Sequence, residues 1–230
     1  MGVVYLIVLA IHLFALSQND DSLATASKPL LMIALIMFFF DRARNTTPKI
    51  KLFIFAALIF SLAGDSFLMF QQQNASYFTY GLASFLVAHI FYILYFRGLR
   101  KLNNAETTPT KKILSGMSVA YAIILLAVLF PKLGSMTIPV IVYGVVISAM
   151  LVSCFLAFAN WNSRFALFST LGAVLFVISD SLLAINKFHT PFAHAGFLVM
   201  LTYGFAQFFL VWGAIKNLNR LTVPKEEKSS

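Results

Sequence analysis

Two aspartates, Asp65 and Asp180, lie inside long apolar segments of this 230-residue chain. Each follows the start of its segment by fifteen residues, counted from Ile50 and from Phe165. If both segments are helices that cross a membrane in the same direction, a rise of 1.5 Å per residue places both carboxyl groups roughly 8 Å below the outer boundary. A charged side chain in the bilayer costs on the order of 3 kcal/mol, so such residues usually face a cavity or one another. Adjacent carboxyl groups that share a proton can divide the roles of general acid and general base, as in hydrolysis.

Lys28 and Tyr143 lie at a similar depth in two other apolar segments. Three ionisable groups at one level of an apolar bundle, Lys28 and the two aspartates, are an uncommon pattern that favours a functional site. Two simpler interpretations of Lys28 stay open. It could form a buried salt bridge that only holds helices together, or its ammonium group could extend to the membrane interface.

The four histidines do not have the spacing of a metal site. His12 lies in the first apolar segment and His89 near the middle of the fourth, while His189 and His194 are expected at the outer surface. The last two are five residues apart across a turn that contains a proline, whereas a helical metal site takes ligands at i and i+4. We therefore expect no metal. The simplest role of His89 is a hydrogen bond inside the bundle.

Polar residues form a stripe along the last apolar segment. Gln207 follows Tyr203 by four residues and Thr202 by five, so the three side chains would lie toward one helix face. They either bind a substrate or form hydrogen bonds between helices, which contribute modestly to stability in membranes.

These side chains must be positioned by elements that lipid can accommodate. The chain is 60% hydrophobic and 11% charged, with a mean hydropathy of +0.86, whereas a soluble domain carries about 25% charged residues. We expect an all-α polytopic membrane bundle, with residues 1–215 as a single transmembrane domain and 216–230 as a charged, disordered cytoplasmic tail. Its eight predicted helices are 2–17, 23–40, 50–70, 77–96, 113–130, 138–158, 165–186 and 192–215.

The basic residues predict the orientation of the bundle. Fourteen Lys and Arg fall on one side of the predicted membrane and three, Lys28, Lys132 and Lys187, on the other. By the positive-inside rule both termini are cytoplasmic, and the membrane is the cell (inner) membrane if the source is bacterial. Because the net charge of +9 lies in short segments between apolar runs, it favours lipid headgroups and argues against nucleic acid as a partner.

Short motifs recur along the chain. Residues 64–68 (GDSFL) resemble residues 179–183 (SDSLL), and residues 85–87 (FLV) recur at 197–199. The offsets of 115 and 112 residues each span four helices, and an even number preserves direction. The pattern suggests two parallel four-helix halves.

Taken in order, these segments resemble the YhhN-like lysoplasmalogenase family. The resemblance extends over residues 23–215 and rests on the order and spacing of short motifs rather than on any one of them. The motifs are 27–29 (SKP), 60–65 (FSLAGD), 81–82 (GL), Phe85, 88–89 (AH), Tyr92, 142–143 (VY), 176–180 (FVISD), Asn186, 202–203 (TY) and 206–207 (AQ).

The resemblance implies an eight-helix membrane hydrolase that cleaves the vinyl ether bond of lysoplasmalogens, releasing a fatty aldehyde and a glycerophospho-alcohol. It places the catalytic aspartates of the family on Asp65 and Asp180 and implies no metal or organic cofactor. The expected partners are the lysophospholipid substrate, with a choline or ethanolamine headgroup, and the bilayer; the oligomeric state is left open. Lys28 and His194 would meet the phosphate, and the remaining expected substrate-binding residues are His89, Tyr143, Asn186, Tyr203 and Gln207.

Two other functions would use the same residues differently. A proton- or ion-coupled transporter would use the aspartates as a relay and would favour helices broken near them. An interaction protein would keep its polar residues for packing, with the aspartates pointing away from any cavity. A hydrolase predicts a pocket that opens sideways to lipid, with both carboxyl groups at its base.

Overall fold

The apolar runs of the sequence fold into helices, because backbone groups in lipid must form their hydrogen bonds within the protein. The computed structural model describes residues 1–158 and 163–222, and within these ranges it contains eight α-helices and no strand. This confirms the expected all-α bundle. The helices are α1 (Gly2–Ser17), α2 (Asp21–Ala43), α3 (Lys51–Met69), α4 (Ser76–Leu102), α5 (Pro109–Leu129), α6 (Thr137–Leu156), α7 (Arg164–Ala184) and α8 (Ala195–Thr222).

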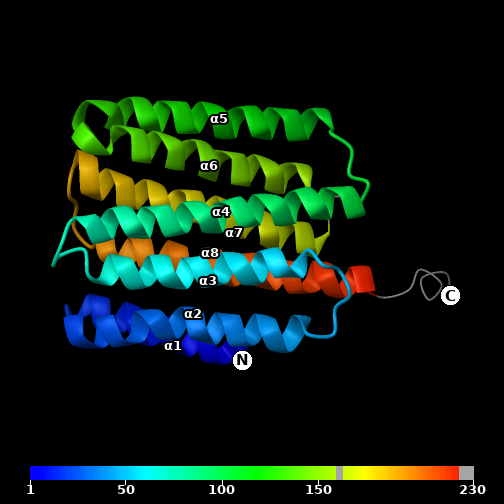
Figure 1. Ribbon diagram of the computed structural model, residues 1–230, viewed down its shortest axis with the longest axis horizontal. Coiled ribbons are helices and arrows are strands. Elements are labelled where there is room, and N and C mark those ends of the chain that lie inside the picture. Colours follow the sequence, from blue (N-terminus) through cyan, green and yellow to red (C-terminus); the bar gives the residue numbers. More distant parts are fainter. Residues whose placement is uncertain (159–162, 223–230) are drawn as a thin grey trace.

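Seven of these eight described helices, α2 to α8, are long and apolar enough to cross a membrane. The chain is therefore an integral, multi-pass membrane protein. The first helix, α1, has 16 residues and a length of about 24 Å, less than the roughly 30 Å of a hydrocarbon core. It accordingly covers only part of the length of the bundle (Figure 1).

The last helix ends later than expected. It continues to Thr222, so residues 216–222 belong to α8 and not to a tail; residues 223–230 lie outside the described residues. The physical reason is packing, because Asn217 and Leu218 are fully buried. Arg220 also donates a hydrogen bond of 2.6 Å to Asn103 Oδ1 beyond the end of α4.

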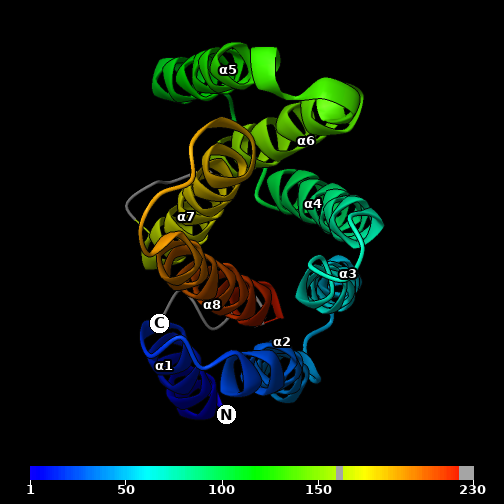
Figure 2. The same ribbon diagram turned by 90° about the vertical axis from the view of Figure 1, so that its left-hand side faces the viewer.

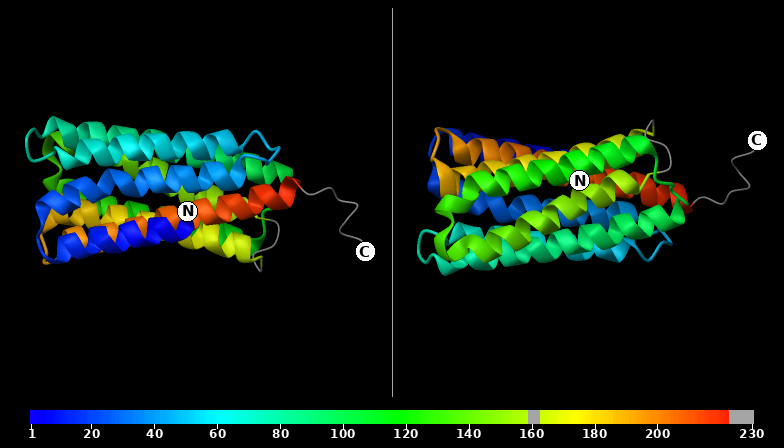
Figure 3. Two further views of the ribbon diagram at one scale, coloured as in Figure 1. Left: turned by 90° about the horizontal axis from the view of Figure 1, so that it is seen from below. Right: turned by 90° about the horizontal axis from the view of Figure 1, so that it is seen from above.

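The helices run along one common axis, with neighbours in the sequence pointing in opposite directions (Figures 1 and 3). The α1–α2, α3–α4, α5–α6 and α7–α8 connections meet at one end of the bundle. The α2–α3 and α4–α5 connections and the C-terminal end of α8 lie at the other. The predicted α6–α7 connection falls largely on residues 159–162, outside the described part. The basic residues therefore lie mostly at the end opposite the α3–α4 connection, as the charge count assumed.

Viewed along this axis, six helices form a ring (Figure 2). In order they are α6, α4, α3, α2, α8 and α7, with α1 outside the ring against α2 and α8, and α5 outside it against α6. The two halves of the chain pack alike: α3 pairs with α4 as α7 pairs with α8, and α4 meets α6 as α8 meets α2. This is the arrangement that two parallel four-helix halves related by a pseudo-two-fold axis would have.

The α7–α8 contact is the tightest in the ring and depends on two glycines. A Cβ at Gly172 would lie 2.6 Å from the backbone nitrogen of Leu210, and one at Gly213 only 2.3 Å from Ser169 Oγ. Small residues let helix backbones approach closely, which is a principal source of helix association in lipid. The contact fixes α7, and with it Asp180, against α8.

Candidate functional site

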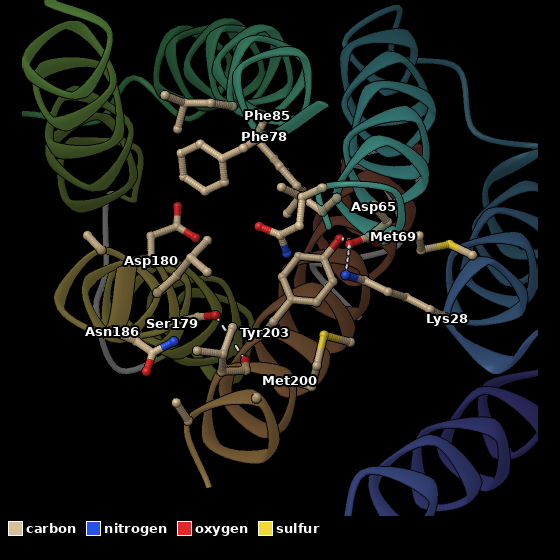
Figure 4. A pocket seen from close by; sticks show the side chains of 18 of the residues that line it. Lys28, Asp65, Met69, Phe78, Phe85, Ser179, Asp180, Asn186, Met200 and Tyr203 are labelled. Carbon is tan, nitrogen blue, oxygen red and sulfur yellow. Dashed lines mark hydrogen bonds and ion pairs between the residues drawn. The ribbon is translucent and has the colours of Figure 1, made fainter. Parts of the chain in front are cut away.

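A cavity of about 430 Å³ occupies one end of the ring, a size typical of small-molecule sites. Asp21, Gln71, Gln72 and Gly196 line its outer part, at the end where α3 and α4 are connected. We call this end the mouth end. Six of the nine residues expected in the site line the cavity, and Figure 4 shows five of them with their labels. These six are Lys28, Asp65, Tyr143, Asp180, Asn186 and Tyr203.

Asp65 lies on α3 and is held by two polar partners (Figure 4). Lys28 Nζ, from α2, is 3.8 Å from Oδ1, and the Tyr203 hydroxyl, from α8, donates a 2.7 Å hydrogen bond to Oδ2. The side chain of Asp65 is only 4% exposed and that of Lys28 17%. The Lys28–Asp65 salt bridge considered as a purely structural alternative is therefore present. Because both side chains line the cavity, the pair is also available to a ligand.

Asp180 lies on α7, on the opposite wall of the cavity from Asp65 (Figure 4). The Tyr143 hydroxyl, from α6, donates a 2.5 Å hydrogen bond to Asp180 Oδ2, and 17% of the Asp180 side chain is exposed. No lysine or arginine of the described chain lies within ion-pair distance of this carboxyl. The two aspartates thus share one cavity but have different neighbours, a cation and a tyrosine for Asp65 and a tyrosine for Asp180.

His89 lies behind Asp180 and does not line the cavity. Its Nδ1 is 2.6 Å from the carbonyl oxygen of Phe85, one turn earlier on α4. A carbonyl oxygen only accepts, so Nδ1 carries a proton and, in the neutral ring, Nε2 is an acceptor. That Nε2 is fully buried, has no hydrogen-bond partner, and lies 3.8 Å from Asp180 Oδ2. His89 can therefore influence a substrate through Asp180 and through Tyr143, whose ring centroid is 5.4 Å from its own, which differs from the expected direct contact.

Gln207 is also behind the cavity wall, where it orients Tyr203. Its amide nitrogen donates to Ser61 Oγ at 3.0 Å and to the Tyr203 hydroxyl at 3.3 Å. The Tyr92 hydroxyl donates to Gln207 Oε1 at 2.8 Å. Because all the groups of this amide have partners, Gln207 is a positioning residue and not a ligand contact. Ser61 and Tyr92 were not expected in the site, although both belong to motifs that carry the family resemblance and Ser61 precedes Asp65 by one helical turn.

The other expected residues lie nearer the mouth end. Asn186 lines the cavity from a short π-helical turn (Ile185–His189) that follows α7, and its Oδ1 accepts from the backbone of Phe192 at 3.3 Å. His194 is exposed and is not part of the cavity lining, although its neighbour Gly196 is. A direct role for His194 in the site is therefore not supported by its position.

His12 and Ser27 form a second polar pair beside the cavity that sequence reasoning did not identify. Ser27 Oγ donates to the carbonyl oxygen of Leu23 at 2.6 Å, so it must accept from His12 Nδ1 at 2.8 Å. His12 lines the cavity next to Lys28. The signals available in the sequence were the position of Ser27 next to Lys28 and its place in the 27–29 motif. Within residues 1–158 and 163–222, no group of three or more His, Cys, Asp or Glu side chains could hold a metal ion.

A family model and several known proteins resemble this chain over more than half of its length. The model of the YhhN family matches residues 23–214. Lysoplasmalogenase TMEM86A from Bos taurus is 35% identical over 169 residues, which cover 71% of this chain and 65% of the relative. Lysoplasmalogenase TMEM86B from Homo sapiens is 31% identical over 200 residues, covering 86% of this chain and 76% of the relative. Lysoplasmalogenase from Mycobacterium tuberculosis is 33% identical over 135 residues, which cover 57% of this chain and 48% of the relative.

The match with the bovine protein spans slightly less than two thirds of that relative's length. No solved structure showed a significant match.

Proposed function

This chain belongs to the YhhN family, and we propose that it hydrolyses the vinyl ether bond of lysoplasmalogens to a fatty aldehyde and a glycerophospho-alcohol. The names of its relatives give the substrate class. One structural observation supports the chemistry most directly: two carboxyl groups with different partners line one cavity within the membrane-spanning bundle.

The difference in partners suggests which aspartate is the acid. The ammonium group of Lys28 neutralises a charge on Asp65 and so favours its ionised form. Asp180 has only uncharged donors and acceptors around it, Tyr143 and the neutral ring of His89, and a buried carboxyl without a counter-charge is best accommodated as the neutral acid. Asp180 is therefore the proton donor and Asp65 the carboxylate.

The reaction begins when Asp180 transfers its proton to the β-carbon of the vinyl ether. The electron pair of the double bond forms the new C–H bond, and the ether oxygen shares the positive charge in an oxocarbenium ion. Asp65 faces this cation across the cavity and stabilises it by its negative charge. No metal or organic cofactor is required at this step.

Water then attacks the cationic carbon, and Asp65 accepts the proton that the water loses. The product is a hemiacetal, which breaks its bond to the glycerol oxygen to give the aldehyde. The Asp180 carboxylate takes the hydroxyl proton of the hemiacetal, and protonated Asp65 returns a proton to the departing alcohol. Both aspartates end in their starting states, and one water has been consumed.

The transporter alternative predicted broken helices near the aspartates. Both α3 and α7 continue without a break through Asp65 and Asp180, although α2 contains Pro29 next to Lys28. An interaction protein would turn the aspartates away from a cavity, whereas both line one. These observations support the hydrolase over the other two functions. The charge count further supports a mouth end on the outer side, with both termini cytoplasmic.

The experiment that tests this function is aldehyde release by the purified chain in detergent. A 1-alkenyl lysophospholipid should yield aldehyde, while the ester-linked lysolipid of the same headgroup should not react. Asp65→Asn, assayed alongside, should lower the rate of aldehyde release about 10²-fold without changing the elution profile or helix content. Full activity in both Asp65→Asn and Asp180→Asn would rule out the mechanism, and no aldehyde from the folded wild-type chain would rule out the substrate.

A further inference from the structure

A second, narrower cavity lies directly behind Tyr143 and Asp180, between α5, α6 and α7. We call it the α5 groove. Its volume is about 60 Å³, and most of its lining is aliphatic. Four residues belong to the lining of both cavities and form a shared wall: Val140, Tyr143, Asp180 and Ala184.

The α5 groove reaches the surface of the bundle that faces lipid. Only 11% of the most apolar stretch of α5 is buried, against 33% to 56% for the other six long helices. On α5, the groove-lining side chains of Ala122, Leu125 and Leu126 are partly exposed. Where the groove ends near the middle of the bundle, the Tyr121 hydroxyl donates to Ser181 Oγ at 2.8 Å and links α5 to α7.

The groove lies beside Asp180 and is much smaller than a whole lipid chain. Along α5 its lining extends from Ser118 to Leu129, which corresponds to about 16 Å. Because the Tyr121–Ser181 hydrogen bond lies beside Asp180 and Leu129 lies near the mouth end, most of this length is on the mouth side of Asp180. A volume of about 60 Å³ is roughly the space of two water molecules in the liquid, so the groove holds only the first carbons of an aliphatic chain, and the remainder must lie in the surrounding lipid.

Below the aspartates, the main cavity offers no continuation for such a chain. Phe85, Phe176 and Tyr203 pack against one another edge to face, with ring centroids 5.5 to 6.4 Å apart. These three rings and fully buried His89 fill the centre of the ring of helices. A long substituent on a group bound between the two carboxyls must therefore turn sideways.

We propose that the α5 groove binds the first carbons of the lysolipid's hydrocarbon chain and directs the chain sideways into lipid, while the main cavity holds its glycerol and headgroup. The proposal rests on the proposed function for the identity of the lipid. The vinyl ether bond joins the chain to the glycerol, so a lipid that occupies both cavities places this bond at the shared wall. Tyr143 and Asp180 form that wall, which brings the proposed acid to the reacting carbon.

Filling the groove should displace the carbons of the chain that follow the ether oxygen. A Cβ at Gly144 would lie 3.2 Å from the side chain of Leu126, so Gly144→Leu would occupy the groove. Ala122→Leu would do so from α5, where partial exposure makes the substitution easier to accommodate. Gly116→Leu is the matched control, because Gly116 is also on α5 and a Cβ there meets no atom within 4 Å.

The measurement is binding of saturated 1-alkyl lysophospholipids, hexadecyl and methyl, by ligand-induced thermal stabilisation of the purified chain. These probes lack the vinyl ether, so their binding does not depend on catalysis. Each buried methylene changes affinity roughly fourfold, and displacing two of them should weaken hexadecyl binding about 15-fold in both groove variants. Binding of the 1-methyl lipid, which has no methylene to place in the groove, and all binding by Gly116→Leu should stay within about twofold of wild type.

Wild-type affinity for the hexadecyl lipid in both groove variants would overturn the proposal. Equal losses for the methyl and hexadecyl lipids would overturn it too, since they would indicate damage to the headgroup site. If the wild-type chain releases no aldehyde but the groove variants still lose hexadecyl binding selectively, the proposed reaction is wrong, while the binding of the lipid chain in the groove is supported. Should Gly144→Leu not fold, Ala122→Leu decides the question alone.

Discussion

The α2–α3 and α6–α7 helix pairs occupy equivalent places in the two halves of the bundle, yet they present different chemistry to the cavity. Lys28 and Tyr143 are 115 positions apart in the sequence, and so are Asp65 and Asp180. In each pair, the residue on the first helix (Lys28 on α2, Tyr143 on α6) contacts the aspartate on the second helix. The contact is an ion pair of 3.8 Å in the first half and a hydrogen bond of 2.5 Å in the second.

This difference shows how a symmetric frame can hold an asymmetric site. Tyr92 and Gln207 are also 115 positions apart, and they bond to each other at 2.8 Å, as residues close to a pseudo-two-fold axis would. The frame thus brings equivalent carboxyl groups to one cavity, and their partners distinguish them: Lys28 and Tyr203 at Asp65, Tyr143 and His89 at Asp180. Different partners assign the proton to one of the two carboxyl groups, which divides the roles of acid and base between them.

The largest effect should come from removing the proposed acid. We expect Asp180→Asn to lower kcat about 10³-fold and Asp65→Asn about 10²-fold, since an amide cannot protonate carbon but can still orient water. Initial rates of aldehyde release at saturating substrate measure both values. The reverse order, with Asp65→Asn the more severe, would exchange the two roles.

Replacing the cation should be the next most damaging change. Lys28→Met leaves Asp65 buried without its counter-charge, which should cost on the order of 3 kcal/mol of stability and reduce kcat/KM about 100-fold. Thermal unfolding and aldehyde release report the two effects separately. In the double variant with Asp65→Asn, stability should recover while activity stays lost. Failure of stability to recover would mean that Lys28 matters through packing and not through charge.

Removing the equivalent partner in the second half should have a smaller effect. Tyr143→Phe deletes one hydrogen bond to Asp180 but leaves no unpaired charge, so we expect kcat to fall about tenfold with little change in stability. Steady-state kinetics beside Lys28→Met provide the direct comparison. A loss as large as that of Lys28→Met would show that the two contacts are equally important and that the asymmetry has another source.

The smallest expected effect concerns Gly64, which corresponds to Ser179 in the other half. A Cβ at Gly64 would lie 2.7 Å from the ring of Phe85, whereas Ser179 has room to donate a hydrogen bond to the carbonyl of Val199. Gly64→Ala should therefore destabilise the chain by about 1–2 kcal/mol and reduce activity only a few-fold. Ser179→Ala is the matched substitution, with an expected cost of about 1 kcal/mol. Unfolding midpoints that do not differ from wild type would show that Phe85 moves freely.

Much of the fold could be predicted from the sequence because lipid imposes simple rules on chain composition. Apolar runs, seven of them of bilayer length, identified the eight described helices, and the equal spacing of Asp65 and Asp180 from the starts of their runs predicted both at one level. The end of α8 was missed because hydropathy falls after Ile215, while Asn217 and Leu218 remain buried by contacts that no local pattern encodes.

The candidate site could be predicted only in part. Depth along a helix follows from residue counting, so Lys28 and Tyr143 were expected beside the aspartates, while Tyr203 was expected from the polar stripe of its helix. All three line the cavity. Whether a side chain points into the cavity depends on how its helix is rotated against its neighbours, and residue counting does not predict this rotation. For this reason His89 and Gln207 were expected on the cavity wall and instead lie behind it, while the contacts of Ser61 and Tyr92 were not foreseen.

The shared wall of Val140, Tyr143, Asp180 and Ala184 separates compartments that open on different media. One leads past Asp21, Gln71 and Gln72 at the mouth end, and the other lies along lipid-facing α5. A lipid cleaved at this wall would release its polar fragment into water and its aldehyde into the hydrocarbon phase. Partition into two phases keeps the fragments from recombining. The aldehyde also does not have to pass through water, where it would react with the amines of other molecules.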